Sequence, residues 1–119
     1  MPIIDTPFLE TLSRFLDVNA ARHQLIVSNL ANIDTPHYHT RDVDFRQEME
    51  RATSGFQYAS EHPAVREVRG LMERPDGNNV DMDKELLSMS NNTMQFETLT
   101  DFVSASLRQL RLAITGRES

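Results

Sequence analysis

A chain of 119 residues provides one domain and is too short for a second large one. Its formal net charge is −6 and its Lys and Arg residues are scattered singly, so neither nucleic acid nor an anionic membrane surface is an expected partner. The chain has no cysteine, which excludes a disulfide framework, a thiolate metal site and a cysteine nucleophile.

The N-terminus begins Met-Pro-Ile-Ile-Asp-Thr-Pro, without a basic region or an apolar run. No window of the chain approaches the roughly 20 apolar residues that a membrane span requires. We therefore expect no cleavable secretory signal and no direct membrane insertion. An export route that reads an uncleaved N-terminus leaves no such mark, so the sequence does not exclude export.

The first predicted element is an amphipathic helix over residues 6–34. Thr6 is placed to cap it, and Pro7 to occupy the first helical position, where a missing N–H costs nothing. Pro36 cannot continue a helix and pushes Thr35 out of the α region, so the helix ends just before them. Its seam alternates strictly between spacings of three and four, as in a coiled coil, and consists of Leu9, Leu12, Leu16, Asn19, His23, Ile26, Leu30 and Ile33.

Two polar residues, Asn19 and His23, interrupt this seam. A polar residue at such a position commonly fixes helix register or partner choice at some cost in stability. The alternative interpretation is a wetter, poorly packed stretch of the helix.

Residues 35–80 form the second predicted segment, which lacks helical periodicity. Glycine and proline recur in a polar background, at Gly55, Pro63, Gly70, Pro75 and Gly77. The pattern predicts irregular or extended structure, with short strands around residues 43–45 and 65–68. A loop of this length is uncommon inside a compact domain, so we expect it to become ordered against a partner.

The third predicted element is a helix over residues 81–115. Asp81 is the expected N-cap, Asp83 and Glu85 place negative charge in the first turn, and Gly116 is the expected stop. Its seam, spaced four and three throughout, consists of Met82, Leu86, Met89, Thr93, Phe96, Thr100, Val103, Leu107, Leu110 and Ile114.

The predicted fold is therefore mainly α: two long terminal helices form a coiled-coil-like hairpin, joined by an irregular middle segment with short β-strands. Burying two seams against each other does not offset the entropy of ordering two such long helices. We expect a hairpin that is marginal alone and completes its core by self-association, unless the middle segment supplies a third layer.

Catalysis has little support in the sequence. His37 and His39, with Asp42 and Asp44 close behind, have donor types suited to zinc or another divalent cation, but the spacing is loose. No serine lies in a nucleophile elbow and no glycine-rich loop is placed to bind phosphate. We assign no catalytic, cofactor-binding or metal site. A small metal-dependent enzyme and a cytosolic helical-hairpin adaptor that binds a partner helix stay open as alternatives.

Two stretches of the chain resemble a known family. The run from Leu25 to Tyr38, followed by Phe45, is similar to the N-L-A-N-x-x-T-P-G-Y signature of bacterial flagellar rod and hook proteins. The run from Asp76 to Asp83 is similar to the G-N-N-V-D-x-D element of the small rod proteins. The matching residues are Asn29, Leu30, Ala31, Asn32, Thr35, Pro36, Tyr38, Phe45, Gly77, Asn78, Asn79, Val80 and Asp81.

His37 stands where this family usually has glycine. If that glycine takes a positive φ, His37 must either accept the strain or adopt another turn.

The resemblance implies a non-catalytic structural subunit of the proximal part of the flagellar basal-body rod, which crosses the periplasm. Its partners would be copies of itself, other rod subunits and basal-body proteins, and the flagellar type III export apparatus, which would read an uncleaved N-terminal region. The terminal helices would form the core of the assembly. We therefore expect an assembly seam of Leu9, Leu12, Leu16, Ile26, Leu30, Ile33, Leu86, Met89, Phe96, Val103, Leu107, Leu110 and Ile114.

Overall fold

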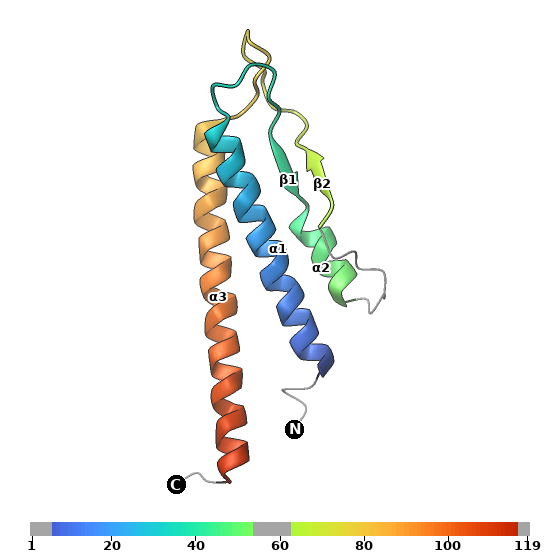
Figure 1. The fold of residues 1–119 in the computed structure, drawn as a ribbon, viewed down its shortest axis with the longest axis vertical. Helices are drawn as coiled ribbons and strands as arrows, with labels where there is room; N and C mark the ends of the chain where they lie inside the picture. The colour runs from blue at the N-terminus through green and yellow to red at the C-terminus, as the bar shows by residue number, and fades with distance from the viewer. Residues whose placement is uncertain (1–5, 54–62, 117–119) are drawn as a thin grey trace.

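The computed structural model describes residues 6–53 and 63–116. Five elements follow one another along the chain: α1 (Thr6–Ala31), β1 (Arg41–Val43), α2 (Phe45–Thr53), β2 (Val65–Glu67) and α3 (Met82–Thr115). The molecule is elongated, at 65 × 31 × 17 Å, with α1 and α3 along its length (Figure 1). The prediction of a mainly α fold with two long terminal helices is confirmed.

Helices α1 and α3 are antiparallel neighbours, and the chain reverses between them at one end of the molecule (Figure 1). Asn19 contacts Asn92 midway along the pair, and the Phe8 ring meets the Phe102 ring with centroids 5.7 Å apart near the start of α1. Since α1 begins at Thr6, the last turns of α3 extend beyond it. None of the helices in the described ranges is long and apolar enough to cross a membrane.

The ends of these helices follow the local signals in the sequence. Asp81 is extended and its carboxylate accepts a hydrogen bond from the Lys84 N–H at 3.2 Å, while Gly116 ends α3 with φ +72°. Helix α1 ends at Ala31, slightly earlier than predicted, and the residues before Pro36 form turns. The predicted N-cap and C-cap of α3 are confirmed.

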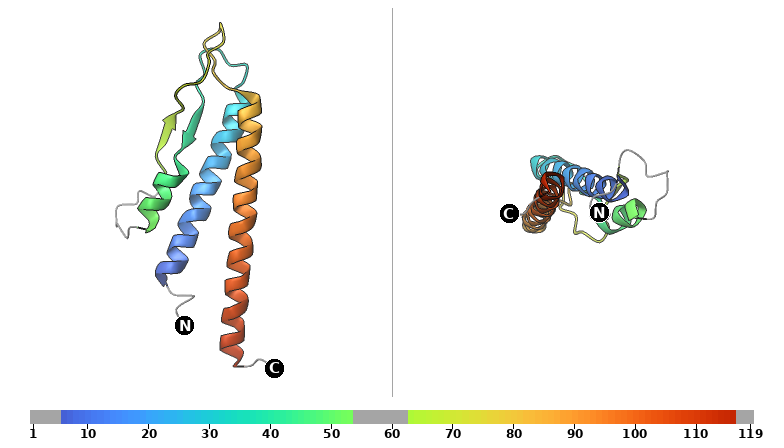
Figure 2. Two further views of the ribbon diagram at one scale, coloured as in Figure 1. Left: turned by 180° about the vertical axis from the view of Figure 1, so that it is seen from behind. Right: turned by 90° about the horizontal axis from the view of Figure 1, so that it is seen from below.

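The middle segment packs against α1 within the same chain (Figure 2). Strands β1 and β2 pair antiparallel, with Arg41 opposite Glu67 and Val43 opposite Val65, which confirms short strands in this segment. Strand β2 begins at the predicted position, whereas β1 ends at Val43, where the expected strand begins. The expectation that the segment orders only against a partner is wrong for the described residues. Residues 54–62 lie outside the described ranges.

Helix α2 was not predicted. Asp44 caps it, because its side chain accepts a hydrogen bond from the Gln47 N–H at 3.1 Å. The helix is short and its sequence, FRQEMERAT, is polar, so few apolar residues mark its buried side. Phe45 begins it and is half-buried.

The core lies on both sides of α1, between α3 and the middle segment. The buried apolar side chains of the described residues are Leu12, Val18, Ile26, Val43 and Val80. Val18 is absent from the predicted seam and completely buried, because α1 has a second buried face that β1 and α2 cover. The middle segment thus supplies the third layer that a two-helix hairpin lacks.

Candidate functional site

The two sequence motifs meet at the end of the molecule where α1 stops and α3 starts (Figure 1). Here the last turn of α1 lies beside residues 35–41 and the loop at residues 74–81, and we call this cluster the motif junction. Most of its side chains are polar, and amide groups hold it together.

Asn29 is the centre of the motif junction. Its side chain is 1% exposed, and its Nδ2 donates to Glu85 Oε1 at 2.5 Å and to the Arg41 carbonyl at 2.9 Å. Its Oδ1 accepts from the Tyr38 hydroxyl at 2.9 Å and from the Arg41 N–H at 3.1 Å. One amide therefore ties α1 to α3, to β1 and to the segment between them, with all its hydrogen-bonding capacity used.

Asn78 closes the turn after α1. Its side chain is fully buried, and its Nδ2 donates to the carbonyls of Asn32 and Thr35 at 2.9 and 2.8 Å. Each of these carbonyls also accepts a backbone hydrogen bond of the turn, from the Thr35 N–H at 3.0 Å and from the Tyr38 N–H at 3.2 Å. Asn32 also binds this turn, since its Oδ1 accepts from the Thr35 hydroxyl at 3.0 Å. The second motif thus binds the turn carbonyls of the first.

The neighbouring amide of Asn79 fixes the extended segment that leads into β1. Its Oδ1 accepts from the Thr40 N–H at 2.7 Å, and its own N–H donates to the Tyr38 carbonyl at 3.3 Å. Arg74 adds a further link, because its guanidinium donates to the carbonyls of Ile33 and Val80. The junction holds both helix ends in one relative position.

His37 adopts a positive φ of +64°, as expected if it replaces a glycine in the left-handed region. Its ring lies over Gly77, which has φ +85°, and a Cβ at Gly77 would lie 2.6 Å from His37 Nδ1. The two motifs are therefore in direct contact at these residues, and the strained histidine depends on the glycine opposite.

Glu85 is a buried carboxylate in the first turn of α3. Burial raises the pKa of Glu85 above its ordinary value, and the hydrogen bond from Asn29 offsets part of that shift. A raised folded-state pKa means that Glu85 favours folding at pH values below its ordinary pKa. That contribution is lost as the pH rises through the folded-state pKa.

The Glu85→Gln variant is expected to be more stable than the wild type at pH 7, with the difference shrinking toward pH 4. The glutamine Oε1 keeps the acceptor for Asn29 and carries no charge to bury. Urea unfolding across this pH range measures the effect. Asn91→Ala, an exposed change in the same helix that removes no titratable group, is the control and should lack this pH dependence. A Glu85→Gln variant less stable at every pH would contradict the assignment.

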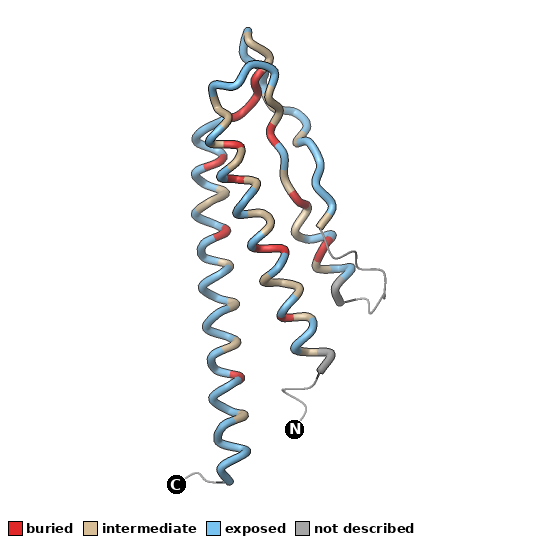
Figure 3. Tube along the Cα trace, viewed as in Figure 1, coloured by how far each residue is buried: buried red, intermediate tan, exposed pale blue. Residues whose placement is uncertain are grey.

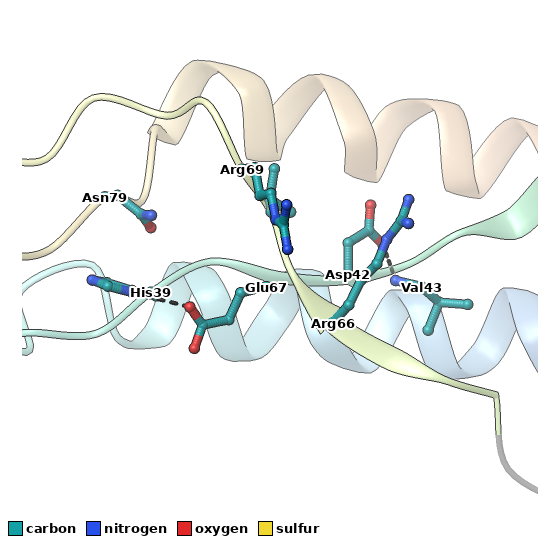
Figure 4. Close-up of a pocket in the computed structure, with 8 residues that line it drawn as sticks. His39, Asp42, Val43, Arg66, Glu67, Arg69 and Asn79 are labelled. Atoms are coloured by element: carbon teal, nitrogen blue, oxygen red, sulfur yellow. Dashed lines mark hydrogen bonds and ion pairs between the residues drawn. The ribbon is translucent and has the colours of Figure 1, made fainter.

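His39, Asp42 and Glu67 help to line a separate polar groove of about 730 Å³ beside the strands (Figure 4). There His39 Nδ1 lies 3.1 Å from Glu67 Oε1, and this hydrogen bond raises the pKa of His39. Asp42 pairs with Arg22 at 3.2 Å, while Asp44 pairs with Arg66 at 3.1 Å. The four candidate ligands are thus dispersed, His37 against Gly77 and the others in separate ion pairs. The described part of the chain contains no group of three or more His, Asp or Glu suited to a metal ion.

Burial of the predicted seam differs between the two helices. In α1, Leu12 and Ile26 are buried, Leu16 and Leu30 are half-buried, and Leu9 is exposed. Ile33, in the turn after α1, is half-buried. In α3, Met89, Val103 and Leu110 are half-buried, whereas Leu86, Phe96, Leu107 and Ile114 are exposed.

The buried residues of α3 are instead Glu85, Asn92 and Ser106 (Figure 3). Each comes one residue before an exposed position of the predicted seam, namely Leu86, Thr93 and Leu107. The buried line of α3 therefore runs beside the predicted seam. Because these residues are polar, a search for apolar periodicity does not find this line.

Asn19 and Asn92 join the helices reciprocally. Asn19 Nδ2 donates to the Asn92 carbonyl at 3.1 Å, and Asn92 Nδ2 donates to the Asn19 carbonyl at 3.3 Å. Both residues are buried, so the pair fixes the register of α1 on α3. His23, the other polar seam residue, is exposed.

The remaining motif residues lie at the helix ends and in the turn between them. Ala31 ends α1 and is exposed, Pro36 is exposed in the turn, Val80 is buried, and Asp81 caps α3. Sequence reasoning did not single out Thr40, Arg74 or Asn92. The links from Arg74 to Ile33 and from Asn92 to Asn19 have no local signal, because these partners lie far away in the chain.

The known proteins that this chain resembles over most of its length agree with the family that the two motifs of the junction indicate. Over 114 residues it is 33% identical to the flagellar basal body rod protein FlgB of Cereibacter sphaeroides, and the match covers 85% of this chain and 88% of that protein. The chain belongs to the FlgB family. FlgB of Salmonella typhimurium is 28% identical over 121 residues, with 85% and 88% of the two chains covered. FlgB of Bacillus subtilis is 23% identical over 120 residues, with 91% and 93% covered.

Membership of the FlgB family confirms the resemblance that the two motifs indicate. The chain is a structural protein of the flagellar basal body rod. No family model matches the chain. Nothing in the FlgB relationship supports a helical-hairpin adaptor.

Proposed function

We propose that the chain is a non-catalytic subunit of the proximal rod that assembles through its terminal helices with copies of itself and with other rod and basal-body proteins. The junction supports this proposal. A rigid connection between two long helices gives each subunit a defined shape, and a stacked assembly requires the same shape in every subunit.

The observation that carries the proposal is the apolar surface that α3 leaves exposed. Leu86, Phe96 and Leu107 are about half exposed, at 49%, 50% and 53%, and Ile114 is 75% exposed. An exposed apolar stripe of this kind on a polar molecule supports a protein–protein contact. These four residues of the predicted assembly seam are thus exposed to neighbours after the chain has folded, whereas Leu12 and Ile26 of the seam are buried within the chain.

Delivery to the rod is a further part of the proposal. We infer that the flagellar type III export apparatus carries the chain to the periplasm by reading its uncleaved N-terminal region. The resemblance of the two motifs supports this route.

Phe96→Ala and Leu107→Ala are expected to abolish motility while leaving the isolated protein folded. Truncating a side chain buried in an assembly costs about 2–5 kcal/mol, whereas the half-exposed monomer loses much less. Swimming in soft agar and recovery of the protein in purified basal bodies measure the effect, with a deletion strain as reference.

Met72→Ala is the matched control, because Met72 is an apolar side chain that is 89% exposed in the loop between β2 and α3. It should swim like the wild type. Normal swimming by Phe96→Ala and Leu107→Ala would contradict the seam. Normal swimming by the deletion strain would contradict the function itself.

A further inference from the structure

Described residues of the three helices line an open groove. Helices α3 and α2 both pack against α1 (Figure 2, right). The groove has a volume of about 520 Å³, and its apolar lining comes from Phe15 of α1, Phe45 of α2, and Met94 and Leu99 of α3. An amphipathic helix laid into it would complete a four-helix arrangement.

Two buried side-chain oxygens in this part of α3 lack a hydrogen-bond donor among the described residues. Gln95, whose Oε1 is buried, lines the groove, and Asn92 Oδ1 is buried one turn earlier. Neither oxygen has a hydrogen-bond partner among the described residues. A buried acceptor without a donor is unfavourable, so an occupant that brings an N–H donor to Gln95 is favoured over a purely apolar one.

The end of α3 carries the apolar side chains and N–H donors that would suit the groove. Residues 107–115 continue past the first turn of α1 (Figure 1), and we call them the overhang. Leu107, Leu112 and Ile114 are 53%, 54% and 75% exposed there. The overhang also carries N–H donors on Arg108, Gln109 and Arg111, and it contains no acidic residue.

Two acidic side chains of α3 follow Met94, which lines the groove. Glu97 lies three residues and Asp101 seven residues after Met94, so both are near its face of α3, and both are exposed. Neither has an ion pair with another described residue. Arg22, the charged residue that lines the groove, is already paired with Asp42 at 3.2 Å. The charges of α3 beside the groove that lack an ion pair are therefore negative, whereas those of the overhang are positive, so the two surfaces of one chain are complementary in charge and polarity.

We propose that the overhang of one copy docks into the groove of the next copy. The apolar side of the overhang covers Phe15, Phe45 and Met94, its arginines face Glu97 and Asp101, and a side-chain N–H of the overhang binds Gln95 Oε1. Because the two surfaces differ, the contact is heterologous and extends head to tail instead of closing as a symmetric dimer. This inference rests on the proposed function and specifies the surfaces of self-assembly.

Mixing two defective variants tests the heterologous contact. Leu107→Asp with Ile114→Asp removes the overhang surface, and Met94→Asp removes the groove surface. All these positions are half or more exposed in the folded chain, so unchanged circular dichroism is expected. Thr98→Arg, which fills the groove from another exposed position, is a second groove variant.

In sedimentation velocity, wild-type protein should form a concentration-dependent series of oligomers, and each variant alone should be monomeric at the same concentrations. An equimolar mixture should form a one-to-one heterodimer and stop there, because it retains one intact overhang and one intact groove. A mixture that stays monomeric, or a variant that still oligomerises, would overturn the inference.

Charge reversal provides the second arm. Arg108→Glu with Arg111→Glu, and separately Glu97→Arg with Asp101→Arg, should each weaken self-association at least tenfold, and the four changes together should restore it. Met72→Asp is the control and should associate like the wild type. Failure of the combination to restore association would overturn the docking, as would a wild type that is monomeric at every concentration. Rod incorporation and motility would still test the proposed function separately.

Discussion

Replacing Asn29 by alanine is expected to destabilise the fold by about 3–5 kcal/mol, a large fraction of the total stability of a domain of this size. The change removes four hydrogen bonds that join α1 to α3, to Tyr38 and to β1. It also leaves the buried carboxylate of Glu85 without its donor, and an unpaired buried charge costs more than the hydrogen bond contributes. Urea unfolding monitored by circular dichroism measures the loss.

Two comparisons make this prediction specific. Asn91→Ala, an exposed asparagine in α3, should leave stability within about 0.5 kcal/mol of the wild type. Asn29→Asp keeps the acceptor for Tyr38 and Arg41 but places a second carboxylate beside Glu85. It should therefore be unstable at pH 7 and recover as the pH falls. Equal stability of Asn29→Ala and the wild type would remove Asn29 from the centre of the junction.

The parts of this fold that the sequence predicts are those with local causes. The ends of α3 depend on Asp81 and Gly116, and the break after α1 depends on Pro36, and each acts on neighbours a few residues away. The positive φ of His37 follows in the same way from the identity of one residue. Such signals are present in any short window of the chain.

The parts that were missed depend on contacts between distant residues. Helix α2 is polar, and its partner α1 precedes it in the chain, so its own sequence does not define a buried face. Val18 lies outside the apolar seam and is nevertheless buried, because the middle segment covers a second face of α1. Tertiary packing determines the structure in both cases, and local hydrophobic periodicity does not predict such packing.

The line of contact on α3 illustrates the same limit. Apolar spacing favours Leu86 and Leu107, yet the neighbouring Glu85 and Ser106 are the buried residues. This arrangement has a physical reason: Glu85 and Asn92 are buried because Asn29 and Asn19 on α1 provide partners for them. Polar residues specify the intramolecular register, and the apolar stripe beside them stays available for assembly. On α3 the predicted apolar positions Leu86 and Leu107 are therefore exposed, whereas Leu12 and Ile26 of the predicted seam on α1 lie in the core.

Gly77→Ala is expected to destabilise the fold by about 2–4 kcal/mol, through two separable effects. Its φ of +85° is unfavourable for alanine, which costs about 1–2 kcal/mol. The added Cβ would also lie 2.6 Å from His37 Nδ1, so the histidine, itself held at a positive φ, must move. Gly70→Ala is the matched control, because Gly70 has φ +83° with nothing within 4 Å and should show the backbone cost alone.

A double-mutant cycle then isolates the contact between the motifs. His37→Gly alone should change stability by less than about 1 kcal/mol, because relief of strain is offset by a more flexible unfolded chain. In the His37→Gly background, Gly77→Ala should cost little more than Gly70→Ala does in the wild type, since the clash with the His37 ring is gone and only the backbone cost and a close approach to the Cα of residue 37 at 3.3 Å remain. The expected coupling energy of about 1–2 kcal/mol follows from the removed clash. Strictly additive costs would show that His37 does not press on Gly77, and the left-handed histidine would then need another cause.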